Sequence, residues 1–268
     1  QVSAHSSMVS MRWSTLSKLD RVSFVSVSSL NQRSIRFDHD ALAPRNVVQH
    51  DGDLVVGHAN HAAVTGQIDA GGKPNVQLPF VLSLKRPHKS RLEIKFAEKT
   101  AFQVYDGAQG WKVRPFLNRD EVEPFTAAEA KSAADAAELD GPLIDYAKKG
   151  TRVELAGTDL VEGKGAYKLK LTLKDGTVRH LWVDAGSFLE AKIDGDPRKL
   201  DGKLRHVAVV YRDFRKVNGL ALPHEMETVV EGVKVTRKLT IQAVAVNAPL
   251  EDALFARPHG PPAKTASR

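Results

Sequence analysis

Apolar and polar side chains alternate in short runs along most of the chain after residue 63. In the run from Ala166 to Lys174, a tyrosine and three leucines occupy every second position, with lysines and a threonine between them. Such alternation predicts a β-strand with one wet and one dry face. Asp175-Gly176 and Asn218-Gly219 each separate two such runs, which is typical of tight hairpins. The pattern predicts about eleven antiparallel strands joined by short turns.

A sheet of this many twisted strands has to curl. Because each strand has one apolar face, the curled sheet would form a barrel or half-barrel with an apolar concave face. We therefore expect a mainly β fold with a helical insert (α+β), built as an unclosed β-barrel of curled antiparallel sheet. A polar loop is expected at 194–203, and the strand from Val233 to Val246 is expected to be the longest.

The segment 124–149 breaks the alternation. Thr126 and Glu129 have the spacing of a capping box at the start of a helix, and alanine dominates the residues that follow. Gly141 predicts a break, after which Pro142 suits the first turn of a second helix. We expect this helix pair to act as a lid over an apolar cavity, anchored by Leu143, Ile144 and Tyr146.

Residues 1–62 differ in composition from the rest. Eleven of the sixteen serines lie in the first 34 residues, and the first glutamate is Glu93. A break this sharp indicates a separate segment, which we expect to be atypical and poorly ordered; a leader segment and a non-native start are the alternatives. A half-barrel domain is expected over 63–258 and a disordered tail over 259–268. His58 and His61 are three residues apart, but without helical periodicity this spacing does not predict a metal site.

The chain carries a net charge of +7, and its lysines and arginines are interleaved with acidic residues. A solvated basic surface is the first interpretation, and an acidic partner such as anionic lipid is the second. The absence of cysteine excludes disulfides, thiolate catalysis and Cys-ligated zinc. No apolar run approaches the ~18 residues of a membrane-spanning helix.

Catalytic motifs are missing from the sequence. It contains no G-x-S-x-G elbow, H-E-x-x-H, P-loop or G-x-G-x-x-G. Asp106, Glu162 and Asp184 fall at predicted turns, where carboxylates usually cap backbone groups or remain solvated. Tyr167 and Trp182 fall with the aliphatic positions, unlike the exposed aromatics of nucleic-acid-binding sheets. We expect no enzyme activity, no cofactor, no metal and no nucleic-acid binding.

A set of short motifs carries a family resemblance. An Asp106-Gly107 turn precedes Trp111, and Asp140-Gly141-Pro142-Leu143 lies in the insert. The hairpin from Tyr211 to Leu220 and the segment Asp252-Ala253-Leu254-Phe255 follow. Over about residues 64–258 the chain resembles the LolA-like family of periplasmic lipoprotein carriers, most of all its standalone outer-membrane lipoprotein-sorting branch. That family normally opens with an N-terminal helix that joins the lid, and 1–62 shows no such helix.

The resemblance implies an unclosed barrel with a helical lid, a hydrophobic cavity for acyl chains and no enzyme activity. It also implies a periplasmic shuttle whose partners are lipid or lipoprotein acyl chains, an inner-membrane transporter and an outer-membrane acceptor. We expect a monomer. The alternative is an envelope interaction module that docks a transporter or another partner through its sheet face.

The strand alternation selects the side chains that would line such a cavity. A shift by one position in any strand would exchange its two faces, and a plain packed core is the alternative interpretation. The candidate lining residues are Leu82, Leu84, Leu92, Ile94, Phe96, Phe102, Val104, Trp111, Leu169, Leu171, Trp182 and Leu239, with Leu143, Ile144 and Tyr146 from the lid.

Overall fold

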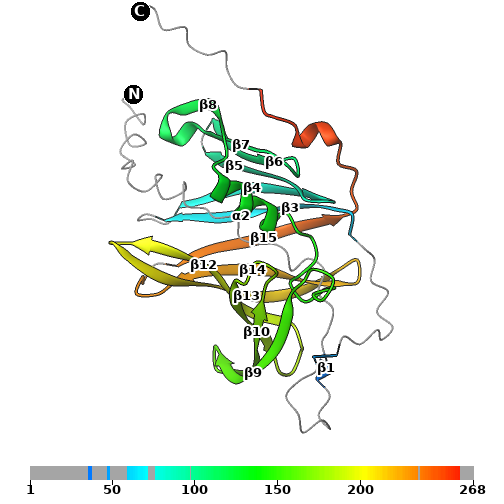
Figure 1. Cartoon of the computed structure of the whole chain (residues 1–268). Helices are drawn as coiled ribbons and strands as arrows, with labels where there is room; N and C mark the ends of the chain where they lie inside the picture. Colours follow the sequence, from blue (N-terminus) through cyan, green and yellow to red (C-terminus); the bar gives the residue numbers. More distant parts are fainter. Residues whose placement is uncertain are drawn as a thin grey trace, which may run out of the picture.

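The structure, a computed structural model, describes residues 36–37, 47–48, 59–71, 76–96, 98–234 and 236–259. Thirteen strands form one antiparallel sheet, and a separate two-stranded pair joins β1 (Arg36–Phe37) to β2 (Val47–Val48) (Figure 1). The strands of the large sheet are β3 (His61–Gly71), β4 (Val76–Lys85), β5 (Lys89–Phe96), β6 (Lys99–Tyr105), β7 (Gly110–Arg114), β8 (Arg119–Pro124), β9 (Arg152–Val161), β10 (Lys164–Thr172), β11 (Val178–Asp184), β12 (Glu190–Leu200), β13 (Lys203–Val217), β14 (Leu220–Val230) and β15 (Arg237–Val246).

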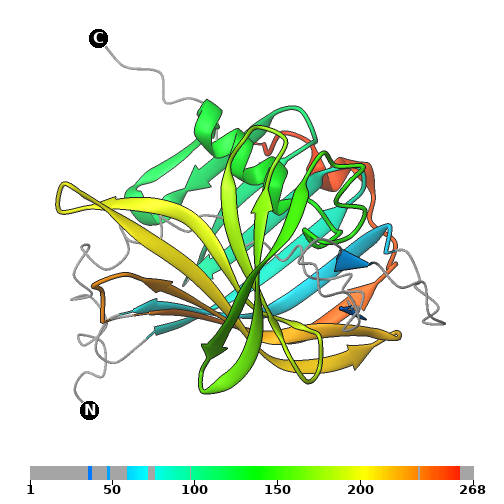
Figure 2. The ribbon, with the colours of Figure 1, turned by 60° about the horizontal axis from the view of Figure 1, so that its bottom comes forward.

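The large sheet consists of two meanders. Strands β3 to β8 neighbour one another in sequence order, as do β9 to β15, and the two series join where β15 pairs with β3. Strands β8 and β9 form the two edges and do not pair with each other. The sheet therefore curls without closing, as Figure 2 shows, and this confirms the predicted fold class.

Turn chemistry explains the hairpins. Asn218-Gly219 forms the predicted two-residue turn, since Val217 pairs with Leu220, and both residues have a left-handed φ, 49° at Asn218 and 83° at Gly219. The β10–β11 loop instead has three residues, 174–176, because the Leu173 N–H donates to the Thr177 backbone oxygen, and its Gly176 has a φ of 84°. Glycine and asparagine tolerate this region better than other residues, and such turns match the twist of the flanking strands. Leu169 of β10 is therefore brought opposite Leu181 of β11, so the apolar positions of both strands share one face.

The insert differs from its prediction. In the described residues it contains one α-helix, α2 (Ala127–Ala136), while 142–150 forms consecutive turns instead of the expected second helix. Asp145 has a φ of +49°, which interrupts a right-handed helix. The capping box at the start of α2 is confirmed: the Thr126 hydroxyl accepts from the Glu129 backbone, and the Glu129 carboxylate accepts from the Thr126 N–H.

Other strand predictions were wrong in detail. The expected loop at 194–203 is mostly strand, because β12 runs on to Leu200 and the turn is formed by Asp201-Gly202. The longest strand is β13 with 15 residues, whereas β15 has 10. The charged edge strand β8 was not predicted, since it lacks apolar alternation. Short 3-10 helices, η3 (Pro115–Leu117) and η4 (Asp252–Phe255), follow β7 and β15.

Most of 1–62 lies outside the described residues, and so do 260–268, so the expectations of poor order and of a missing N-terminal helix fall there. No helix within the described residues has both the length and the apolar character that a membrane crossing requires.

The main core lies on the concave face of the sheet, which we define as the face that carries Leu82 and Leu169. Buried side chains from β3, β4, β5, β13, β14 and β15 pack there into one cluster, together with Leu139 from the insert and Phe116 from η3. A second cluster combines Leu143 of the insert with Leu169, Leu171 and neighbours on β11. The insert therefore covers the concave face and contacts both clusters.

Candidate functional site

A pocket of about 400 Å³ lies between α2, the turns that follow it and the concave face. Its sheet wall is mostly apolar and comes from β10, β12 and β13. Its lid wall alternates alanine with charged residues. The apolar side chains of the sheet wall include Leu171, Ile193, Val207, Val209 and Tyr211.

The first turn of α2 is held against β7. Lys112, a buried lysine on the concave face of β7, forms an ion pair with Glu129. Burial raises the pKa of Glu129, but Lys112 and the hydrogen bonds from Thr126 outweigh this and lower it overall. Glu129 is therefore both helix cap and anchor, and it remains charged at neutral pH.

The apolar contact of α2 is thin, as its alanine content predicts. Ala133 and Ala137 are buried against Tyr105, and Phe125 packs beside them. Alanine side chains bury little area, so this contact contributes little hydrophobic stabilisation. Much of the remaining attachment of the lid is polar.

The middle of α2 is tied to the opposite side of the pocket. Arg179 of β11 lies 2.7 Å from Asp196 of β12 and 3.8 Å from Asp135 of α2. Burial raises the pKa of Asp135 above its usual value, although Arg179 acts against this effect. Lys131 contacts Asp175 at the β10–β11 turn, at 2.8 Å. Charges from both walls therefore meet at this end of the pocket.

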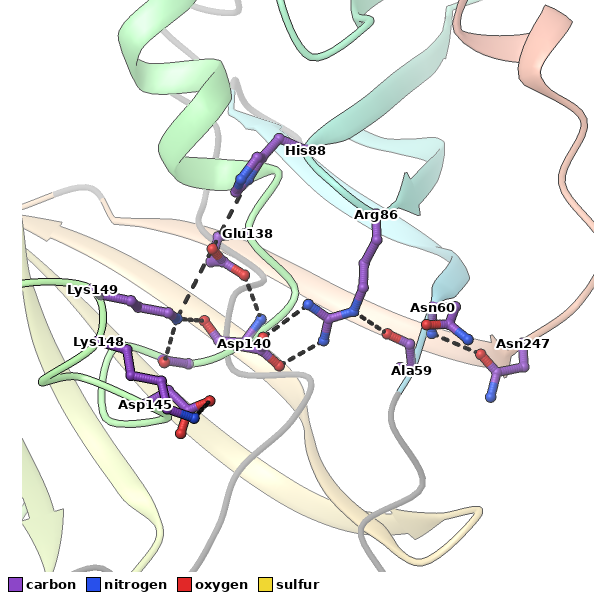
Figure 3. A network of polar contacts seen from close by, with 11 residues as sticks. Ala59, Asn60, Arg86, His88, Glu138, Asp140, Asp145, Lys148, Lys149 and Asn247 are labelled. Atoms are coloured by element: carbon purple, nitrogen blue, oxygen red, sulfur yellow. Dashed lines mark hydrogen bonds and ion pairs between the residues drawn. The ribbon is translucent and has the colours of Figure 1, made fainter.

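The end of the lid is fixed by a polar network around Arg86, shown in Figure 3. The Arg86 guanidinium donates two hydrogen bonds to Asp140, at 2.7 and 2.8 Å, and a third to the backbone oxygen of Ala59 at 2.9 Å. This pairing raises the pKa of Arg86. Lys149 lies 3.3 Å from the Asp140 backbone oxygen and 3.9 Å from Glu138. One arginine at the end of β4 therefore joins the lid to the residue that leads into β3.

The pocket combines an apolar wall with a charged rim. An apolar wall can hold a hydrocarbon, and the charged rim can contact a polar head group. In the part of the chain that the structure describes, no group of three or more His, Asp or Glu side chains is placed to hold a metal ion.

The predicted lining residues divide between two faces. On the concave face, Leu82, Leu84, Leu92, Ile94 and Leu239 belong to the filled core, and Phe96 packs against it. Leu169, Leu171 and Leu143 form the second cluster, Ile144 is buried and Tyr146 is half-buried. The structure describes all of the predicted lining residues. Of these, only Leu171 lies in the pocket wall.

Phe102, Val104, Trp111 and Trp182 lie on the opposite, convex face. Phe102 stacks beneath Arg91, whereas Trp182 lies between Lys168 and Lys192 and donates to Asp159 at 2.9 Å. In β6, Val104 faces Trp111 across the strand pair, out of phase with Tyr105 on the pocket side. Contact of any of the candidate residues with a ligand stays a prediction.

The charged residues of the pocket were not predicted from the sequence, yet one signal was present. Arg179 has the same strand parity as Leu181 and Val183, so it places a charge on an otherwise apolar face. A charge there needs a partner from the covering layer, and Asp135 supplies one. The apolar wall from Val207 to Tyr211 lies in a predicted strand, but alternation alone does not separate a pocket from a filled core.

Comparison with known proteins gives the fold a name. No family model and no curated protein matches the sequence. Among solved structures, a LolA superfamily protein from Nitrosomonas europaea superposes with a TM-score of 0.51 at 16% identity, over 74% of this chain and 90% of that one. The chain has a LolA-like fold. This confirms the resemblance at the level of fold.

Two further structures share the LolA-like fold. A DUF1329 family protein from Desulfovibrio piger has a TM-score of 0.53 at 14% identity, over 75% of this chain and 91% of its own. A putative outer membrane lipoprotein-sorting protein domain from Vibrio parahaemolyticus has a TM-score of 0.51 at 13% identity, over 73% and 89%. At these identities the likeness concerns the fold alone.

Proposed function

We propose that this LolA-like chain is a non-enzymatic carrier that holds the acyl chain of a lipid or lipoprotein in the pocket under its lid. We place it in the periplasm as a monomer that moves its ligand from an inner-membrane transporter to an outer-membrane acceptor. The observation that carries the proposal is the pocket of about 400 Å³ between an apolar sheet wall and a separately anchored lid. The shared fold of the putative outer membrane lipoprotein-sorting protein domain from Vibrio parahaemolyticus adds support.

The pocket volume limits the ligand to one chain. A methylene group is taken to fill the ~30 Å³ that a water molecule occupies in the liquid. A volume of 400 Å³ then holds on the order of 13 methylenes. At ~0.8 kcal/mol for each buried methylene, such a chain contributes about 10 kcal/mol of binding free energy. A second or third acyl chain would require the lid to open or would remain outside.

The polar anchors of the lid fit a carrier that must release its cargo. Arg179 and Arg86 hold the lid at two places through ion pairs, while the alanine contact is weak. Because ion pairs can exchange with water, α2 can detach from the sheet while losing little apolar contact of its own. Opening would expose the sheet wall and let the acyl chain leave.

Uptake of a fluorescent fatty acid by delipidated protein tests the proposal. The wild type should bind with a stoichiometry of one, and Ile193→Trp should abolish uptake because the indole would occupy the pocket. Val178→Trp is the matched control, since Val178 is 48% exposed and outside the pocket wall. Absence of uptake by folded wild type, or equal uptake by the two variants, would refute the carrier function.

A second candidate is an envelope interaction module, and one observation favours it. Leu155 and Leu160 of edge strand β9 are 37% and 68% exposed. An edge strand offers unpaired backbone groups to a partner chain. This candidate predicts that Leu160→Lys weakens partner binding and leaves fatty-acid uptake unchanged.

A further inference from the structure

The hairpin between β12 and β13 extends beyond the rest of the sheet, with the β14–β15 turn beside it (Figure 1, left; Figure 2, left). The β14–β15 turn contacts the start of β13: the Glu231 N–H donates to the His206 backbone oxygen at 2.9 Å. Gly232 also lies against the Arg205 guanidinium. We call residues 198–205 together with 231–234 the basic tip.

Charge and exposure distinguish the basic tip. It contains five basic residues and two acids, and its most exposed apolar side chain is Leu204, at 71%. Val233, at 37%, adds a second apolar group. The basic residues are Arg198, Lys199, Lys203, Arg205 and Lys234.

Within the described part of the chain, the lysines of the basic tip have no acidic partner. Lys199, Lys203 and Lys234 are exposed and form no ion pair with any described residue. Exposed lysines elsewhere differ in this respect: Lys131 and Lys148 pair with aspartates, whereas Lys95 and Lys216 form no salt bridge with a described residue. The basic tip differs from both in grouping its lysines around an exposed leucine. Unpaired cations around an exposed leucine suit a surface that is both anionic and apolar just beneath, which describes the head-group region of an anionic bilayer.

We propose that the basic tip docks on an anionic membrane surface, with its lysines among the head groups and Leu204 inserted below them. The same hairpin carries the pocket rim, since Asp196 and Arg198 line the pocket. Lys199 follows Arg198 directly, and the turn at Asp201 lies three residues on, roughly 10 Å along the strand. Docking would therefore bring the pocket close to the bilayer.

Vesicle co-sedimentation tests the docking. Wild-type protein should bind vesicles of equal parts phosphatidylglycerol and phosphatidylcholine, should not bind phosphatidylcholine alone, and should detach as salt is raised. Each lysine near a charged surface contributes about five-fold to partitioning, so Lys199→Gln/Lys203→Gln/Lys234→Gln should lose roughly 100-fold. Leu204→Ser should lose about ten-fold.

The matched control removes the same charge elsewhere. Lys95→Gln/Lys164→Gln/Lys216→Gln changes exposed lysines outside the basic tip and lowers the net charge of +7 by the same amount. It should keep most of the binding. An equal loss in both triple variants, or equal binding to both vesicle types, would overturn the proposal.

Insertion of Leu204 has its own readout. Because the chain has no cysteine, Leu204→Cys accepts a single polarity-sensitive fluorophore. Its emission should shift to the blue with anionic vesicles, while a label at Lys95→Cys should not respond. An unresponsive label at 204 would refute insertion into the membrane. An equal shift caused by soluble polyglutamate would refute it too, and would indicate an acidic protein partner. Ile193→Trp should still bind vesicles, so failure of the carrier proposal and failure of docking can be told apart.

Discussion

Strands β4 and β5 and strands β12 and β13 both turn apolar side chains toward the inside of the curled sheet, yet they are covered differently. Over β4 and β5 the leucines and a phenylalanine meet Leu139 and Phe116, and the space is filled. Over β12 and β13 the inward residues include Gly195 and two valines, and the layer above is α2 with its alanines and acids. Smaller side chains on both layers leave a pocket. The difference shows that side-chain volume, and not only polarity, decides where space remains between the sheet and its cover.

The largest expected effect comes from truncating one side chain in each region. Leu84 is completely buried, so Leu84→Ala should lower the free energy of unfolding by about 3 kcal/mol. Ile193 borders the pocket and is half-buried, so Ile193→Ala should cost about 1 kcal/mol. Chemical denaturation measures both values. Equal losses would mean that the two regions are packed alike.

A smaller effect is expected at the lid network. Asp140→Asn replaces a charge-assisted, bidentate contact with Arg86 and should destabilise the lid by about 1 to 2 kcal/mol. Hydrogen exchange should become faster in 138–150 and stay unchanged in β4 and β5. Asp145→Asn is the control: its partner Lys148 is 80% exposed, so no measurable change is expected. Faster exchange throughout the protein would show that the network stabilises the whole domain.

The smallest effect concerns pH. Burial raises the pKa of Asp135, so the docked lid binds a proton more readily than the open lid does. The lid should therefore bind the sheet more strongly as pH falls from the raised pKa of Asp135 toward the ordinary value of 3.8. Above that window the charged Asp135 carboxylate should weaken this contact. Asp135→Asn should abolish this dependence in exchange measurements on α2. A pH dependence that survives the substitution would assign it to another group.

Much of the fold could be predicted from the sequence because its signals are local. Short turns that contain glycine fix hairpin partners, and the capping box fixes the start of α2. The prediction of a second helix was wrong. Leu143 and Ile144 suit a helix by composition, whereas their packing against the sheet favours turns. The prediction of a loop after Asp194 was also wrong. Pairing with β13 holds this polar stretch as a strand although it lacks apolar alternation.

Less of the pocket than of the fold could be predicted from the sequence. Strand parity in β6 and β7 placed Val104 and Trp111 with the inward set, although the register turns them outward. Ion pairs such as Arg179 with Asp135 join residues far apart in the chain, and no local pattern announces them. A charge in phase with buried leucines is the one clue that was available.

The pairing of β3 with β15 has a consequence for how the chain folds. Each meander can form from neighbouring hairpins as it leaves the ribosome or a translocation channel, but the ladder between His61–Gly71 and Arg237–Val246 must wait for the C-terminal strand. Closing a loop of that length is entropically costly and slow compared with hairpin formation. Until then, the inner edges of both meanders are unpaired, and a chain truncated before β15 would leave them exposed to other chains.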